Sequence, residues 1–440
     1  MARAVWPFVF PLLACHPSPG LQPGGPASDD SDTPTTSETD SDGITDSDGL
    51  VDTDTSRDSD TALAEDTDVP PVCPAGVAAF VAGLGYPDLQ SAFDASMDQD
   101  TIDICPGRWS TDVSVFYDGS LTVQSINGDE NSVVLLPPVF NEASIDIKHL
   151  TGTARPTVIF QNLTIEGRVV IYGKQPWYET DGNVIISNIT MPESGSFHIS
   201  HFSTANISSV RATSGDKLNF EAISIQEVRD SIRLEDIYLT GVNYWAQIIS
   251  IIRMRTVPDN LNIELRNLTI SGNSTASVSP LLLILEGGST TVEISDSTFT
   301  GHDAAVPYID TPESGMIEIM GRFDRPADID VQINNCLFDG NLGGIASHLT
   351  VLTNGRDYGG HTNVHIRDTA FYRGDYAPAF LPSGTENDGH AIRRRFDTVV
   401  HFDNVDFGTG PTSNLRDLTN CPDIEGIVAS AVWESDATCP

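Results

Sequence analysis

Aromatic, acidic and basic side chains are concentrated in the segments that follow Gly272, Gly301, Gly340 and Gly374. The residues among them that are best suited to bind a ligand are Tyr308, Asp310, Arg322, Arg325, Arg356, Tyr358 and Tyr376. Aromatic rings stack on the faces of sugars, and charged side chains hold hydroxyl or uronate groups. This combination predicts a flank that binds a polysaccharide or another surface glycan, although loops are also polar simply because they are solvated.

Motifs that would define a known chemistry are absent from the sequence. The chain contains no nucleophile elbow, zinc-binding helix, phosphate loop or dinucleotide fingerprint. A catalytic site can still be assembled from side chains on separate segments, and spacing along the sequence then gives no signal. What matters is therefore which elements hold the polar segments side by side.

One short pattern recurs from about residue 155 onward, and the polar segments follow it at the same position in each repeat. Two alternating apolar residues precede an Asn or Asp, and a further apolar residue follows three positions later. The polar anchors are Asn162, Asp236, Asn267, Asp296, Asn335, Asp368 and Asn404, with a weaker copy at Asn188. Alternation with period two is typical of a strand, and Asn or Asp tolerates left-handed backbone geometry. The pattern predicts a strand that bends at the same point in every repeat.

A second apolar run lies between successive anchors, at residues 248–252, 281–285, 316–320 and 349–352. Each repeat thus has room for two or three short strands. Because one repeat cannot bury its own inner face, the repeats must stack in register. The strands keep the same polarity and the same asymmetry, which favours parallel stacking over an antiparallel sandwich or a propeller.

This stacked pattern resembles the right-handed parallel β-helix family, the pectin-lyase-like architecture, over roughly residues 80–410. Residues 89–109 are similar to the N-terminal segment of such proteins, in which a short helix precedes the first strand and a Pro-Gly turn. Leu89, Ala92 and Phe93 fall on one face of that helix, which is expected to cap the open end of the stack. The predicted fold class is all-β, a right-handed parallel β-helix with a short N-terminal capping helix after a disordered acidic linker.

The resemblance also implies candidates for catalysis. Polysaccharide lyases of this fold pair Ca²⁺-binding carboxylates with an Arg or Lys that removes the proton next to a uronate. Asp388, His390 and Arg393 offer such groups, but no catalytic segment of the family can be matched residue by residue. The segment Gly389-His390-Ala391 departs from the Gly-His-Gly of polygalacturonases. Two hypotheses follow: a non-catalytic, adhesin-like module that binds glycans, which the missing signatures favour, and a Ca²⁺-dependent polysaccharide lyase.

The first residues of the chain predict export. Arg3 precedes a short apolar run that ends Leu12-Leu13-Ala14-Cys15, as in a secretory signal peptide. These last four residues also resemble the lipobox of bacterial lipoproteins, which implies cleavage before Cys15 and a lipid on its thiol. An ordinary signal peptide that is cut further along is the alternative. The expected location is the outer membrane or the cell surface, with the lipid as the membrane anchor.

Residues 29–68 are dense in Asp, Ser and Thr and carry a single basic residue, Arg57. Such a stretch cannot bury enough apolar surface to offset its ordering entropy, so we expect an extended, disordered tether. The segment from Glu38 to Gly49 imitates a Ca²⁺ loop but lacks its closing bidentate Glu. The formal net charge of −39 would repel nucleic-acid phosphates, so no nucleic-acid partner is predicted.

The remaining cysteines bear on the fold of an exported protein. An oxidising compartment makes the local pairs Cys73 with Cys105 and Cys421 with Cys439 plausible disulfides. Cys336 is left over, and its apolar neighbours predict a buried, inert thiol. The predicted boundaries are residues 1–14 for the signal peptide, 15–68 for the linker, 69–110 for the N-terminal cap and first repeat, 111–410 for the β-helix and 411–440 for a C-terminal cap.

Overall fold

A computed structural model describes most of the chain beyond residue 72. The described residues are 73–137, 143–149, 155–173, 182–192, 195–216, 221–244, 247–253, 260–275, 282–286, 288–303, 316–321, 328–343, 346–352, 362–372, 375–376, 390–395, 398–405 and 424–428. All of them lie in the second of two units into which the chain divides, Thr67–Pro440. The predicted signal peptide, Cys15, the acidic linker, Cys421 and Cys439 lie outside these residues. None of the described helices is long and apolar enough to cross a membrane.

The described part is an all-β structure built on two large sheets, as predicted. Sheet A contains β1 (Ala79–Val81), β2 (Leu84–Tyr86), β3 (Asp100–Ile104), β4 (Gly107–Ser110), β6 (Leu121–Ser125), β7 (Val133–Leu136), β9 (Thr157–Ile165), β11 (Asn183–Thr190), β13 (Thr204–Asp216), β15 (Ser231–Tyr244), β17 (Leu261–Arg266), β18 (Thr269–Ser271), β19 (Ser274–Thr275), β21 (Thr290–Ser295), β22 (Thr298–Thr300), β24 (Ile329–Asn334), β25 (Leu337–Asp339), β28 (Thr362–Arg367), β29 (Ala370–Tyr372), β32 (Thr398–Val405) and β33 (Ile424–Val428).

Sheet B and a small third sheet hold the other strands. Sheet B has the order β31 (His390–Arg395), β27 (Ala346–Leu352), β23 (Ile317–Gly321), β20 (Leu282–Glu286), β16 (Ile249–Arg253), β14 (Ile223–Gln226), β12 (Ser196–Ser200), β10 (Arg168–Tyr172), β8 (Ala143–His149) and β5 (Val113–Tyr117). A two-stranded sheet pairs β26 (Leu342–Gly343) with β30 (Asp375–Tyr376). The second apolar run of each repeat therefore forms its own sheet, as its recurrence predicted.

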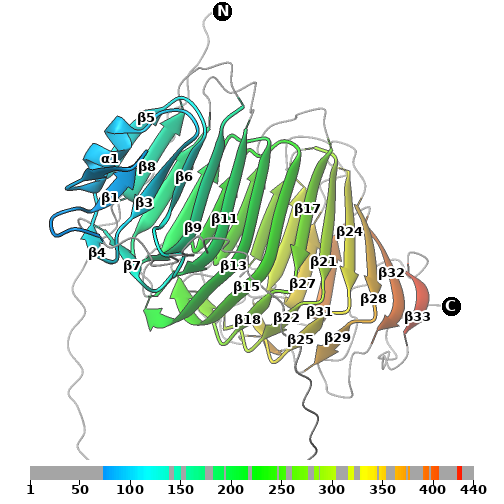
Figure 1. Ribbon diagram of the computed structural model, residues 1–440. Coiled ribbons are helices and arrows are strands. Elements are labelled where there is room, and N and C mark those ends of the chain that lie inside the picture. Colours follow the sequence, from blue (N-terminus) through cyan, green and yellow to red (C-terminus); the bar gives the residue numbers. More distant parts are fainter. Residues whose placement is uncertain are drawn as a thin grey trace, which may run out of the picture. The chain divides into compact units, whose positions relative to one another are not determined.

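The chain alternates between the two sheets. From β9 onward, after the one to three consecutive sheet A strands of a repeat, the chain enters sheet B, and it then returns to pair in parallel with the sheet A strands it left, as β9, β11, β13 and β15 do (Figure 1). The pairing is in register, so that Val158 lies beside Val184 and Ile232 beside Ile263. Equivalent side chains thus stack from repeat to repeat, an arrangement compatible with a β-helix-like solenoid.

Inward side chains of both sheets form one continuous core. In sheet A the inward column includes Val292, Val331 and Val364, all fully buried or nearly so, while intervening residues face outward. After the bend, the stacked rings of Phe299 and Phe338 lie 5.0 Å apart between centroids. Because each repeat contributes only one layer of this core, its apolar surface is buried only when the next repeat stacks upon it.

The bend between the two parts of each sheet A strand lies at the predicted polar anchors. All eight anchors have φ between +47° and +57°, and Asn335, for example, has φ +52°. Ser209 takes the same place in β13 with φ +53°, a copy that the sequence pattern missed because it is neither Asn nor Asp. Left-handed backbone is costly for most residues, so the anchor types follow from local geometry.

Helix α1 (Leu89–Ala95) lies at the N-terminal end of the stack. Asp88 caps it by accepting a 2.7 Å hydrogen bond from the Ser91 backbone N–H. Leu89, Ala92 and Phe93 are its buried residues, as predicted. The Gln90 Oε1 accepts from the Ser114 backbone N–H at 3.1 Å, which satisfies one donor on the edge strand β5.

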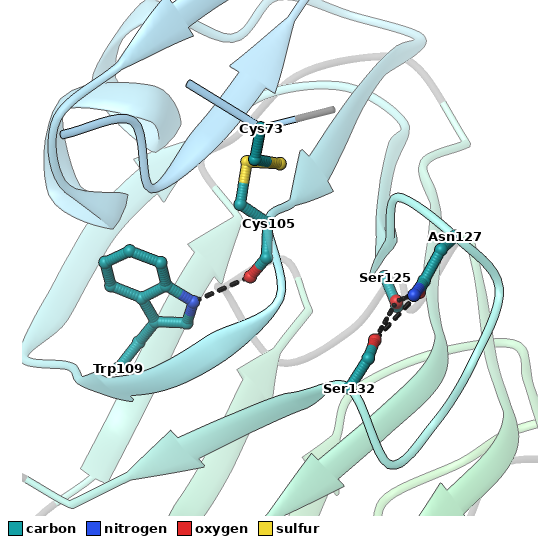
Figure 2. The surroundings of a disulfide bond; sticks show 6 residues. All are labelled: Cys73, Cys105, Trp109, Ser125, Asn127 and Ser132. Carbon is teal, nitrogen blue, oxygen red and sulfur yellow. Dashed lines mark hydrogen bonds between the residues drawn. A yellow bond between two sulfur atoms is a disulfide. The ribbon is translucent and has the colours of Figure 1, made fainter. Parts of the chain in front are cut away.

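A disulfide ties the first described residue to the end of β3. Cys73 and Cys105 are bonded, which confirms that predicted pair, and the Trp109 indole donates to the Cys105 carbonyl at 2.8 Å (Figure 2). Strands β1, β2 and β3 pair antiparallel, unlike the rest of sheet A. This local hairpin was not predicted, because Ala82 and Gly83 at its turn are not a common hairpin pair.

Candidate functional site on the outer face of sheet B

Most of the predicted ligand-binding flank falls outside the described residues. This applies to Tyr308, Asp310, Arg322, Arg325, Arg356, Tyr358 and Asp388. Tyr376 lies in β30, and His390 and Arg393 lie in β31, but only their backbone is described. Sheet register places Arg393 beside Thr350 and, through successive pairs, in one row with His198. Six strand spacings separate the two residues, roughly 30 Å, so they do not form one site.

The outer face of sheet B carries polar and aromatic side chains at its N-terminal end. Its patch consists of Phe116 on β5, Asp146 and Lys148 on β8, Arg168 and Tyr172 on β10, and His198 and Ser200 on β12; we call these residues the outer patch. Their neighbours along each strand, such as Ile147, Ile171 and Ile199, point into the core. Alternation along four adjacent strands therefore positions all seven side chains on one surface.

Two aromatic rings of the outer patch lie in one row, two strands apart. Register pairs Phe116 with Lys148, and Lys148 with Tyr172. The Phe116 ring is 67% exposed, unusual for a phenylalanine, and the Lys148 ammonium lies 5.9 Å from its centroid. With about 4.8 Å between strands, the rings are spaced by roughly 10 Å. Such a spacing suits two successive flat surfaces of an extended ligand.

Hydrogen-bonding atoms without a protein partner lie beside these rings. The Asp146 Oδ1, His198 Nδ1 and Ser200 Oγ are buried, and none has a hydrogen-bond partner. The other carboxylate oxygen of Asp146 forms a 2.6 Å ion pair with Lys148. A buried polar atom that lacks a partner costs free energy comparable to a lost hydrogen bond. Three of them on one patch indicate a place where a polar ligand, or water that stands in for it, completes the hydrogen bonding.

His198 is held neutral at physiological pH. Burial lowers its pKa to about 4, and the nearby Arg168 guanidinium and His201 lower it further. Its ring contacts the Tyr172 ring edge-on, at 5.5 Å between centroids. A neutral imidazole offers both a donor and an acceptor, which matches a sugar hydroxyl better than an imidazolium does. Among the described residues, the Arg168 side chain forms no ion pair.

Serine side chains continue the row of His198, which is a different row from that of the two aromatic rings, beyond β12. Ser224 and Ser250 follow His198 in register, and the Ser250 hydroxyl donates to the Ser224 hydroxyl at 3.2 Å. Both serines are buried, although they face away from the core. The outer face of sheet B therefore changes from exposed aromatic and charged groups at β5 and β8 to buried small polar groups at β14 and β16.

Metal ligands do not converge in the described part of the chain: no group of three or more His, Cys, Asp or Glu side chains is placed to hold an ion there. The Ca²⁺ expected for a lyase thus stays a prediction. Asp388, the carboxylate predicted for such a site, is not among the described residues.

Sequence reasoning missed the outer patch because its residues fall at ordinary outward positions of strands. The alternation in the segment from Ser196 to Ser200 does place His198 opposite the core, and this signal could have been read. What could not be read is that Phe116 and Tyr172, far apart in sequence, share one row. That neighbourhood depends on the lengths of the intervening loops.

Comparison with known proteins adds no further information on the site. The chain matches no protein-family model, no curated protein and no solved structure.

Proposed function

We propose that the chain is a right-handed parallel β-helix that serves as a non-catalytic, glycan-binding module at a bacterial cell surface. Lipid on Cys15 holds it at the outer membrane, and residues 15–68 act as the tether. The glycan lies across the strands of sheet B, along the row from Phe116 to Ser200. Its rings stack on Phe116 and Tyr172, while its hydroxyls meet the polar side chains between and beside them.

One observation carries this proposal: the exposed ring of Phe116 and the partly exposed ring of Tyr172 adjoin buried polar atoms that have no protein partner. Sugars are unusual ligands in requiring both, since each ring has an apolar face and a rim of hydroxyls. A stable protein partner would instead bury roughly 800 Å² on each side, more than two aromatic rings provide. The predicted flank around Tyr358 and Arg356 would then extend the same binding role, rather than form a separate catalytic centre.

The test is a titration of the full chain with neutral and acidic polysaccharides by calorimetry. The Phe116→Ala and Tyr172→Ala variants should each weaken binding about fivefold to tenfold, because loss of one stacked ring costs ~1 kcal/mol. Tyr238→Ala is the matched control, since this ring is 41% exposed on β15 of sheet A, away from the outer patch. An equal loss in all three variants would contradict the proposed site.

A second readout separates binding from catalysis. The same mixtures, incubated with Ca²⁺, should develop no absorbance from unsaturated sugar products. Turnover that a chelator and Arg393→Ala abolish would replace the binding module with a Ca²⁺-dependent lyase. If no polysaccharide binds at all, the glycan-binding function is wrong.

A further inference from the structure

A groove runs along the bends of sheet A, on a different surface from the outer patch. It has a volume of about 550 Å³ and follows four successive repeats. Its lining consists of Asp296, Ser297, Thr298, Asn335, Cys336, Leu337, Asp368, Thr369, Ala370 and Asn404. Because the repeats stack in register, the groove presents the same contacts again and again along its length.

The bend residues along the groove alternate between Asp and Asn, so the same residue type recurs only in every second repeat. The Asn335 amide donates to the Asp296 carboxylate at 2.8 Å, and the Asn404 amide donates to Asp368 at 2.7 Å. One pair further toward the N-terminus, Asn267 donates to Asp236 in the same way. The described bends therefore present three successive Asp–Asn pairs, each with one exposed carboxylate.

The carboxylates are not required by the bend itself. Asn162 and Asn188 occupy the same positions in earlier repeats, and there an amide donates to an amide oxygen at 2.8 Å. Asparagine adopts the left-handed backbone at least as well as aspartate does. An all-Asn ladder would therefore serve the fold, and the carboxylate in every second repeat calls for another explanation.

Charge and spacing together define what such a groove can recognise. Two strand spacings separate equivalent carboxylates, which is roughly 10 Å. A β-1,4-linked sugar chain turns over at each residue, so the same face recurs every second residue with a closely similar period. Anionic polymers are disfavoured by the carboxylates and by the net charge of −39. A polymer of amino sugars instead places an ammonium group beside each carboxylate.

We propose that the groove binds an extended strand of a β-1,4-linked amino polysaccharide, with one disaccharide for each Asp–Asn pair. Asp296 and Asp368 accept hydrogen bonds from the ammonium groups, while Thr298, Leu337 and Ala370 contact the sugar rings. Arg266 and Arg367 lie 3.6 Å and 3.5 Å from these carboxylates in exposed ion pairs. Such pairs contribute little, so a ligand cation can replace them.

The experiment titrates the full chain with a β-1,4-linked glucosamine hexamer, its N-acetylated counterpart and a lysine hexamer of equal charge. The glucosamine hexamer should bind at least tenfold more tightly than the other two. The double variant Asp296→Asn with Asp368→Asn should reduce this affinity at least tenfold. Glu264→Gln is the control for charge, because Glu264 is a half-exposed carboxylate of β17 that lies outside the groove.

Two further measurements keep the outcomes distinct. Thermal unfolding of the double variant should match that of the unmodified chain, because Asn–Asn pairs keep the ladder. The loss of affinity in the double variant should be the same factor in a Phe116→Ala background, which separates the contribution of the groove from that of the outer patch. Equal binding of the lysine hexamer, or equal loss in Glu264→Gln, would reduce the effect to general charge attraction and overturn the proposal. So would the absence of binding by the glucosamine hexamer.

Discussion

At the scale of single residues, His302 shows how one side chain can conflict with the repeat that contains it. It lies between Asn273 and Asn341, which are buried at equivalent positions in the adjacent repeats. Each asparagine amide donates to a backbone carbonyl of the preceding repeat, at 2.9 Å and 3.0 Å. The His302 Nδ1 lies 3.1 Å from the Asn273 carbonyl, but its Nε2 is buried without a partner. Burial lowers the His302 pKa to about 4.

We predict that His302→Asn makes the fold less sensitive to acid. The unfolded chain protonates this histidine near pH 6.5, whereas the folded chain does not until about pH 4, so its contribution to stability falls as the pH drops through that window. Between pH 6.5 and pH 5 the unfolding free energy of the variant should therefore decline by ~2 kcal/mol less than that of the unmodified chain. Urea unfolding at both pH values measures this, and equal declines would contradict it.

At the scale of elements, the bends depend on a residue that can hold left-handed backbone and also donate to its neighbour. Asn335 does both, with φ +52° and an amide that donates to Asp296. We predict that Asn335→Ala lowers the unfolding free energy by about 2 kcal/mol, from the strained φ together with the lost hydrogen bond. Asn335→Gly should cost about 1 kcal/mol, since glycine relieves only the strain. If Asn335→Ala and Asn335→Gly lowered the unfolding free energy equally, backbone strain at this position would not contribute to the loss.

The strands and bends could be predicted wherever a turn-forming residue type coincides with a period-two alternation of apolar residues. Anchors such as Asn267 and Asp296 combine a turn-forming residue with alternating apolar neighbours, so both the bend and its recurrence can be read. The buried ladder of Asn273, His302 and Asn341 was not predicted, because an Asn after a glycine indicates only a loop. Nor could the outer patch be assembled, because strand register decides that Phe116 meets Lys148. Local pattern specifies elements, whereas register depends on the whole stack.

The N-terminal disulfide covalently closes the segment that contains the capping helix α1. Cys73 and Cys105 are separated by 32 residues, a span that includes β1, β2 and α1. We predict that Cys73→Ser lowers the unfolding free energy by ~3–4 kcal/mol, because closing such a span restricts the unfolded chain. Urea unfolding under non-reducing conditions tests this. Added reductant should destabilise the unmodified chain to the same extent and leave the variant unchanged, and a variant as stable as the oxidised chain would show the bond to be incidental.

At the scale of the whole molecule, buried neutral histidines should govern the response to acid. His149, His198 and His302 are each more than nine-tenths buried, and burial lowers each pKa to about 4. The fold therefore loses stability as the pH falls from about 6.5 toward 4, by up to ~4 kcal/mol per pH unit for three groups. Urea midpoints at pH 7.5, 6 and 5 should show this slope. An unfolding free energy that stays level over that range would contradict it.

The alternation of Asp and Asn along the bends also has a consequence for how such a chain can change in length. Removing one repeat from between Asp236 and Asn404 would bring two aspartates, or two asparagines, into contact at the cut. Two carboxylates about 4.8 Å apart repel, whereas removing two repeats together restores Asp against Asn. Removing a single aspartate repeat instead leaves two asparagines in contact, a pairing that Asn162 and Asn188 already make. In this region, viable length variants of the protein should therefore lack single aspartate repeats or pairs of repeats, but never an asparagine repeat alone.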